Sequence, residues 1–197
     1  MALAIAIVMC TRIATANLDS ARGTLPLILV AVQIALPFFL LAFTASSLAR
    51  LWPGRATRWL LRNRRYFGLA FAYGMAWHIG FVGYYFTRFG NPLDRVALVL
   101  DLIGLVFLLA LTLTSFRRVA SRLTPGRWRT LHKTGVYVIW LLATDINLGA
   151  ARAHHDVLHV SMLAALIGAW ILRLACWSKR SLRGRLRFAF HTPSASR

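Results

Sequence analysis

Acidic residues are scarce in this chain. Only five of its 197 residues are acidic, against 24 Lys and Arg, so the formal net charge is +19. Cysteine is also rare. Cys10 and Cys176 lie in apolar segments near opposite ends of the chain and form no CxxC motif. The sequence therefore offers no disulfide framework, and both cysteines are interpreted as small hydrophobic side chains in a membrane.

The excess of positive charge does not indicate nucleic-acid binding. Hydrophobic residues make up 58% of the chain and the mean hydropathy is +0.61, more than a soluble domain of this length needs. The basic residues lie in short segments between apolar runs, whereas a nucleic-acid-binding domain carries them along one soluble face. This distribution excludes nucleic acid as the partner and predicts an integral membrane protein in a lipid bilayer.

Five apolar segments approach the ~20 residues that a helix needs to cross the hydrocarbon, and helices satisfy their own backbone groups in lipid. They cover residues 25–48, 66–86, 96–115, 131–148 and 158–177. The apolar stretch 2–10 is too short to span, and it is interpreted as a truncated first helix rather than a signal peptide, because no basic region precedes it. The prediction is an all-α bundle of five long transmembrane helices plus a short or truncated N-terminal helix.

Arginine clusters set the orientation of these helices. Dense basic clusters occupy residues 49–65, 116–130 and 178–197, whereas the intervening loops 11–24, 87–95 and 149–157 hold little net charge. Positive charge favours the cytoplasmic side. We therefore expect a multi-pass protein of the bacterial inner membrane with a cytoplasmic C-terminus. Its domains are an N-terminal segment and outer loop (1–24), a transmembrane domain (25–177) and a basic cytoplasmic tail (178–197).

Ionisable side chains inside the membrane are candidate functional residues. His78 lies deep in segment 66–86, and Gly74, four residues earlier, shares its helix face. Two interpretations stay open at this point. The glycine makes room for a flat macrocycle that the imidazole binds, or it lets two helices pack closely while His78 forms a hydrogen bond between them.

His132 is shallower, near the basic loop that precedes segment 131–148. A low-spin b-type haem takes a neutral imidazole on each side of its iron, and basic residues at the rim can pair with its propionates. Arg64 and Arg129 are suitably placed at the cytoplasmic side. Anchoring of the protein by positive charge remains the alternative for each arginine, and an interfacial histidine remains the alternative for His132.

Two further polar sites are candidates. Asp145 has about the depth of His78, where a carboxylate needs a partner, a proton or a wet cavity. It either bonds His78 or a water in a proton path, or it serves helix packing. Near the outer surface, His155 and His159 share the i, i+4 spacing of a transition-metal site, but no third strong ligand accompanies them.

Several segments resemble the ferric reductase-like transmembrane family, and within it the haem-binding membrane subunits of periplasmic methionine sulfoxide reductase systems. The resemblance spans about residues 25–177. It is carried by residues 63–69 leading to Trp77-His78, by residues 114–116, by the W-x-x-L-H motif at 128–132, and by residues 135–140.

The resemblance implies a six-helix bundle that holds haem b, with His78 and His132 at positions of iron ligands. Members of this family carry electrons from a flavin or quinol donor on the cytoplasmic side to an acceptor on the outer side. The chain has no segment suited to a flavin or nucleotide domain, so a flavin would come through a partner protein, with a redox partner on the outer side.

The chain departs from the family at both partner positions, where Arg64 and Asp145 replace the second histidine of each helix. The two remaining histidines differ in depth by about 15 Å in straight helices. Either tilt closes this gap, or haem is bound differently, or haem has been lost. A non-redox scaffold and a small transporter with Asp145 and His78 as a proton relay therefore remain alternative functions.

Overall fold

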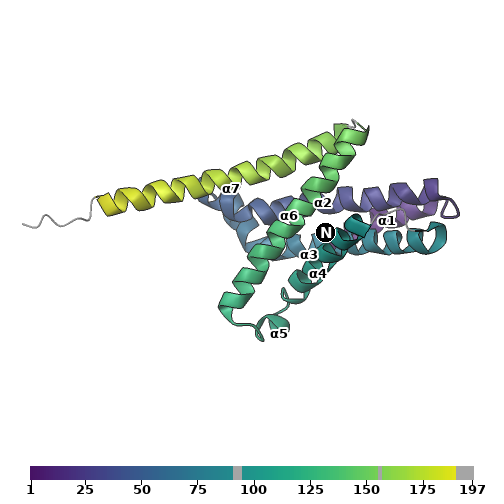
Figure 1. Cartoon of the computed structure of the whole chain (residues 1–197). Coiled ribbons are helices and arrows are strands. Elements are labelled where there is room, and N and C mark those ends of the chain that lie inside the picture. Colours follow the sequence, from purple (N-terminus) through teal and green to yellow (C-terminus); the bar gives the residue numbers. More distant parts are fainter. Residues whose placement is uncertain (91–94, 155–156, 190–197) are drawn as a thin grey trace, which may run out of the picture.

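The computed structural model describes the backbone of residues 1–90, 95–154 and 157–189, and the side chains of these residues except 153–154 and 180–189. The described residues form helices and their connections, without strands (Figure 1). The helices are α1 (Ala2–Thr15), α2 (Ala21–Leu51), α3 (Arg55–Phe89), α4 (Arg95–Leu113), α5 (Arg117–Ala120), α6 (Pro125–His154) and α7 (Val157–Ala189).

Four of the described helices are long and apolar enough to cross a membrane, namely α2, α4, α6 and α7. This confirms the prediction of an all-α, multi-pass membrane protein. The remaining predicted span, residues 66–86, lies within α3, which has 35 residues but does not reach the same mean hydropathy. Its glycines, tyrosines and His78 lower the hydropathy. The short N-terminal helix α1 has 14 residues and extends five residues beyond the predicted stretch 2–10, to Thr15.

The basic segments predicted as loops are mostly helical. Between α2 and α3 only residues 52–54 are non-helical, so the cluster expected in loop 49–65 lies mainly on the first turns of α3. Likewise α7 continues past residue 177 to Ala189, so the first part of the basic segment 178–197 is helical. Local hydropathy marks where a helix leaves the hydrocarbon, but the backbone of a helix can continue into water because arginine and lysine are good helix formers.

The closest packing joins α2 and α3, which lie side by side along most of their length (Figure 1). Phe39 and Phe43 of α2 pack with Phe71 of α3 in the largest buried cluster, and Trp140 of α6 stacks on Phe43 at its edge. Helix α1 packs on the same pair through Ile5 and Met9. Helix α7 packs against α2 of this pair, and α6 packs mainly against α7 and α4.

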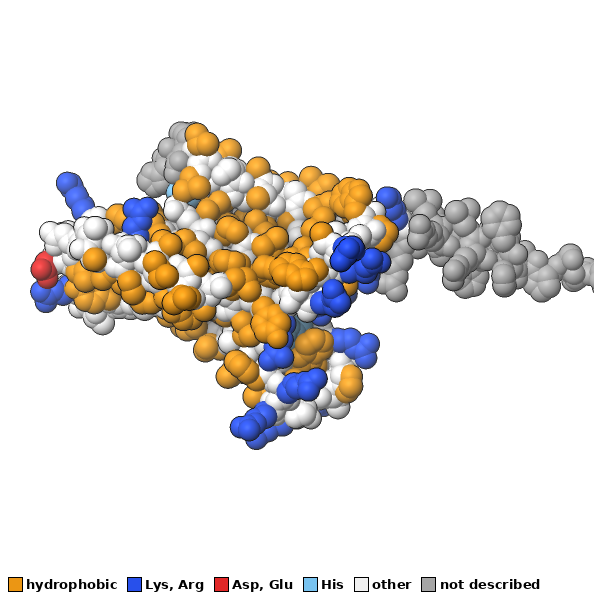
Figure 2. All heavy atoms as spheres, turned by 180° about the vertical axis from the view of Figure 1, so that it is seen from behind, with side chains coloured by type: hydrophobic (Ala, Val, Ile, Leu, Met, Phe, Trp, Pro, Cys, Tyr) orange, Lys and Arg blue, Asp and Glu red, His pale blue; other side chains and the backbone are white. Residues whose placement is uncertain are grey.

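Charge and apolar surface are separated along the molecule. Figure 2 shows Lys and Arg side chains gathered at the right and the bottom of the view, a smaller charged group at the left, and hydrophobic side chains across the middle. On α4 only Leu108 is buried, and large side chains such as Val106 and Leu109 are exposed. In a lipid bilayer such exposed apolar side chains meet acyl chains rather than water.

Candidate functional site

A pocket of about 580 Å³ opens where α2, α3, α4, α6 and α7 come together at their basic ends. We call it the basic pocket. Its cationic lining residues are Arg50, Arg64, Arg65, Arg129, Lys133 and Arg173. No acidic side chain of the described residues lines it. The hydroxyls of Ser46, Ser47, Thr112 and Ser115 and apolar side chains complete the wall.

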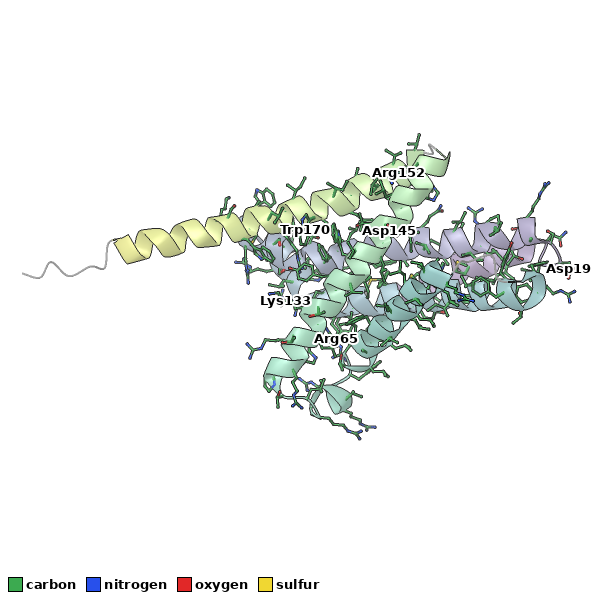
Figure 3. The ribbon with its side chains drawn as sticks, in the orientation of Figure 1. Asp19, Arg65, Lys133, Asp145, Arg152 and Trp170 are labelled. Atoms are coloured by element: carbon green, nitrogen blue, oxygen red, sulfur yellow. The ribbon has the colours of Figure 1, made fainter. Side chains whose placement is uncertain are left out.

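The structure brings together three of the residues that the sequence singled out. His132, Arg64 and Arg129 all line the basic pocket, although they come from two different helices. Lys133 lies next to His132 on α6, toward the lower end of that helix in Figure 3. A pocket of this size lies within the ~300–1,000 Å³ range of small-molecule sites.

His132 is held by the end of α4. Its Nε2 lies 3.0 Å from Thr114 Oγ1, and that hydroxyl donates its hydrogen to the Ala110 carbonyl at 2.6 Å. Because a hydroxyl has one hydrogen, Nε2 of His132 must be the donor toward Thr114. The Trp128 ring stacks on the imidazole at 4.3 Å, and its indole N–H donates to the Thr114 carbonyl at 3.1 Å. The W-x-x-L-H motif therefore clamps α6 to α4.

His78 lies elsewhere. Its Nδ1 is 3.1 Å from the Ile28 carbonyl of α2, and it is not among the residues that line the basic pocket. A carbonyl only accepts, so Nδ1 carries the hydrogen, and in the neutral ring Nε2 is an acceptor. This arrangement orients an imidazole for a ligand at Nε2. It equally fixes α3 to α2, which is the second interpretation of His78.

Gly74 is buried against α2. A Cβ placed on it would meet the Ala35 Cβ at 2.8 Å and the Ala31 carbonyl oxygen at 3.7 Å. The space beside Gly74 is therefore filled by the backbone of the neighbouring helix. Of the two interpretations of this glycine, the observed contacts are those of close helix packing.

Asp145 does not meet His78. It is exposed on α6, nearer the end of that helix opposite Lys133 (Figure 3). The carboxylate close enough for its charge to act on His78 is Asp101 of α4. Hydropathy could not pair Asp101 with His78, because it does not tell which helices are neighbours.

The metal site expected near the outer surface falls largely outside the described residues, since the side chains of His154 and His155 are not described. His159 is half-buried on α7 and has an interaction with its surroundings. Within residues whose side chains are described, no three His, Cys, Asp or Glu side chains gather as a metal site.

Sequence reasoning missed Arg173. This residue lies in the apolar part of α7 and lines the basic pocket beside Cys176 and Trp177. An arginine inside the predicted span 158–177 was the signal that could have found it, because a charge at such a position needs a functional or structural reason.

Comparison of the chain with protein-family models, with curated proteins and with solved structures finds no match.

Proposed function

We propose that this protein is a haem b-binding membrane subunit that transfers electrons from a cytoplasmic-side donor to an acceptor on the outer side. The observation that carries the proposal is the position of His132 on the wall of a pocket that Arg64 and Arg129 also line. An imidazole, several cations and an apolar surface in a membrane bundle are groups that contribute to binding a b-type haem.

The lining residues fit this cofactor. His132 offers the imidazole, Arg64 and Arg129 offer positive charge for the two propionates, and Phe39 and Phe71 offer apolar contact. When bound, haem supplies one-electron transfer. For His132 Nε2 to hold the iron of a bound haem, its proton would have to move to Nδ1 of the same ring, and the hydrogen bond to Thr114 would be lost at a cost of about 1 kcal/mol.

The proposal includes the orientation and the remaining span. Helix α3 crosses the bilayer beside α2, which completes the five long spans and the short N-terminal helix of a ferric reductase-like plan. The ends of α2, α3 and α6 that carry the arginines face the cytoplasm of a bacterium, with the C-terminus on the same side. A flavin or quinol donor then acts at this side, through a partner protein in the case of flavin.

An absorption spectrum of the purified protein tests the proposal. After expression with excess haem we expect a Soret band and a pyridine haemochrome corresponding to haem bound at His132. His132→Ala should remove most of the bound haem, whereas His159→Ala, on the opposite end of the bundle, should retain it. Wild-type protein without a Soret band, or equal haem content in both variants, would contradict the proposal.

A non-redox scaffold is the second candidate, and the clamp between Trp128, His132 and Thr114 favours it. In this interpretation the W-x-x-L-H motif serves only to fix α6 to α4, and Gly74 only to pack α3 on α2. Haem bound tightly at one per chain would exclude this function. A proton relay through Asp145 has less support, since Asp145 is exposed.

A further inference from the structure

Arg173 differs from the other cations of the basic pocket. The five others, Arg50, Arg64, Arg65, Arg129 and Lys133, are exposed, whereas Arg173 is half-buried. It belongs to the apolar part of α7, one turn after Trp170, which is labelled in Figure 3. The rim of the pocket is therefore solvated, and its floor holds one partly desolvated charge.

Two aromatic rings hold this guanidinium in place. Its Cζ lies 4.1 Å from the centre of the Phe43 ring of α2 and 4.9 Å from that of Tyr137 of α6. Ring faces attract a cation but leave its net charge unchanged. The guanidinium thus has a fixed position between three helices and keeps its full positive charge.

No carboxylate of the described pocket wall neutralises that charge. The Tyr137 side chain forms a hydrogen bond with the guanidinium and, with Cys176, favours its charge, whereas the like charge of Arg64 opposes it. An uncompensated charge in a low-dielectric site is costly, and an anion that enters the pocket removes this cost. The guanidinium can donate two parallel hydrogen bonds to a carboxylate or phosphate.

Beside the serine, threonine and tyrosine hydroxyls, the wall carries a large apolar surface. Phe39, Phe71, Leu108, Leu111, Val136 and Ile139 extend the pocket toward the centre of the bundle. A small hydrated anion would leave this surface without contacts. The combination of an apolar surface and a half-buried cation therefore favours a ligand with a hydrophobic body and an oxyanion group.

We propose that Arg173, held between Phe43 and Tyr137, binds the carboxylate or phosphate group of an amphipathic ligand in the basic pocket. This inference rests on the proposed function for the use of this pocket, but it does not require iron. The two sources of such a group are the propionates of a porphyrin and the headgroup of an anionic lipid.

Metal-free protoporphyrin IX and its dimethyl ester separate the anion contact from iron ligation. In titrations of the detergent-solubilised full-length protein, followed by porphyrin fluorescence, we expect the free acid to bind at least tenfold more tightly than the ester. Arg173→Leu should weaken binding of the acid about tenfold and leave the ester unchanged. Arg173→Lys should retain part of the preference, and Arg58→Gln, an exposed arginine outside the pocket, should retain all of it.

Equal binding of acid and ester by the wild type, or unchanged acid binding in Arg173→Leu, would overturn the inference. If Arg173→Leu does not fold, the comparison of the wild type with Arg173→Lys decides. The inference is then overturned if Arg173→Lys binds the acid as tightly as the wild type does, or if the wild type does not prefer the acid to the ester.

A second arm distinguishes this inference from the proposed function. Wild type and Arg173→Lys are reconstituted in phosphatidylcholine nanodiscs with added phosphatidylglycerol, and retained lipid is measured by native mass spectrometry. Retention of phosphatidylglycerol that depends on Arg173, without any porphyrin binding, would refute the haem proposal and support the Arg173 site. Haem binding that is unchanged in Arg173→Lys would support the haem proposal and refute the Arg173 site. A protein that binds neither porphyrin nor phosphatidylglycerol would refute both proposals.

Discussion

The two intramembrane histidines sit in opposite surroundings. His132 faces an open pocket with six cationic lining residues, and its Nε2 donates to Thr114. His78 lies between packed helices, and its Nδ1 donates to the Ile28 carbonyl. In their neutral forms the two rings are therefore opposite tautomers, with different nitrogens left as acceptors.

This difference separates a position that can accept a ligand from one that holds helices together. Near His78 the helices α2 and α3 approach so closely that Gly74 has no room for a Cβ. The basic pocket beside His132 is instead lined by residues of α2, α3, α4, α6 and α7, which together leave a space of about 580 Å³. The same residue type thus serves packing in one half of the bundle and lines a pocket in the other.

The largest effect is expected from a substitution that tests the close packing of α2 and α3 near His78. Gly74→Ala places a methyl group 2.8 Å from the Ala35 Cβ, so α2 and α3 must move apart. We expect a loss of about 1–3 kcal/mol in stability, the usual cost of overpacking. Thermal unfolding in detergent measures it. Gly83→Ala on the same helix is the matched control, because its Cβ meets nothing within 4 Å.

An unfolding temperature that falls equally in both glycine variants would mean that helix flexibility, rather than the close approach of α2 and α3, governs stability. An unchanged unfolding temperature in Gly74→Ala would show that α2 and α3 leave room for a methyl group near His78. The contrast between the surroundings of His78 and His132 would then disappear.

An intermediate effect is expected from Thr114→Val, which removes the hydrogen-bond partner of His132 at the basic pocket. Stability should fall by about 1 kcal/mol, the net value of a lost hydrogen bond. At the same time Nε2 of His132 is released, so haem should bind about threefold to tenfold more tightly. Unfolding and haem titration of the same preparation measure the two opposite changes.

Thr144→Val is the control for this substitution. Thr144 makes the same kind of hydrogen bond, from Oγ1 to the Trp140 carbonyl at 2.8 Å, but it does not line the basic pocket. Haem affinity should be unchanged in it. Weaker haem binding in Thr114→Val than in this control would show that Thr114 stabilises the haem-bound protein. His132 would then not give up its hydrogen bond to Thr114 in order to bind iron.

The smallest effect is expected from His78→Gln. The glutamine amide can replace Nδ1 as the donor to the Ile28 carbonyl, so stability should change by less than about 1 kcal/mol. The Soret band should stay unchanged, because His78 does not line the pocket. His78→Leu, which removes the donor, is the control and should lose more stability than His78→Gln. A lost or shifted Soret band in His78→Gln would make His78 an iron ligand.

Much of the fold could be predicted from hydropathy. The spans at 25–48, 96–115, 131–148 and 158–177 correspond to α2, α4, α6 and α7, because a long apolar run in lipid can only form a helix. The ends of the helices were predicted less well. The structure begins α3 at Arg55 and ends α7 at Ala189, since charged residues end the apolar stretch without ending the helix.

The candidate site was accessible only in part. Arg64, Arg129 and His132 do line one pocket. Gly74 was grouped with His78 by its spacing of four residues, and Asp145 by its depth alone. Depth along a helix does not give the direction in which a side chain faces. Asp145 is exposed, Gly74 backs onto Ala35, and Arg173, which was not considered, reaches the pocket from α7.

The sequence by itself determined that this chain is helical, that it lies in a membrane and that its positive charge gathers at helix ends, because these properties depend on local composition. The tertiary structure decided which polar residues share a pocket. That outcome depends on how closely α2 and α3 approach and on where α6 and α7 cross them, and such distances arise from contacts between residues far apart in the chain.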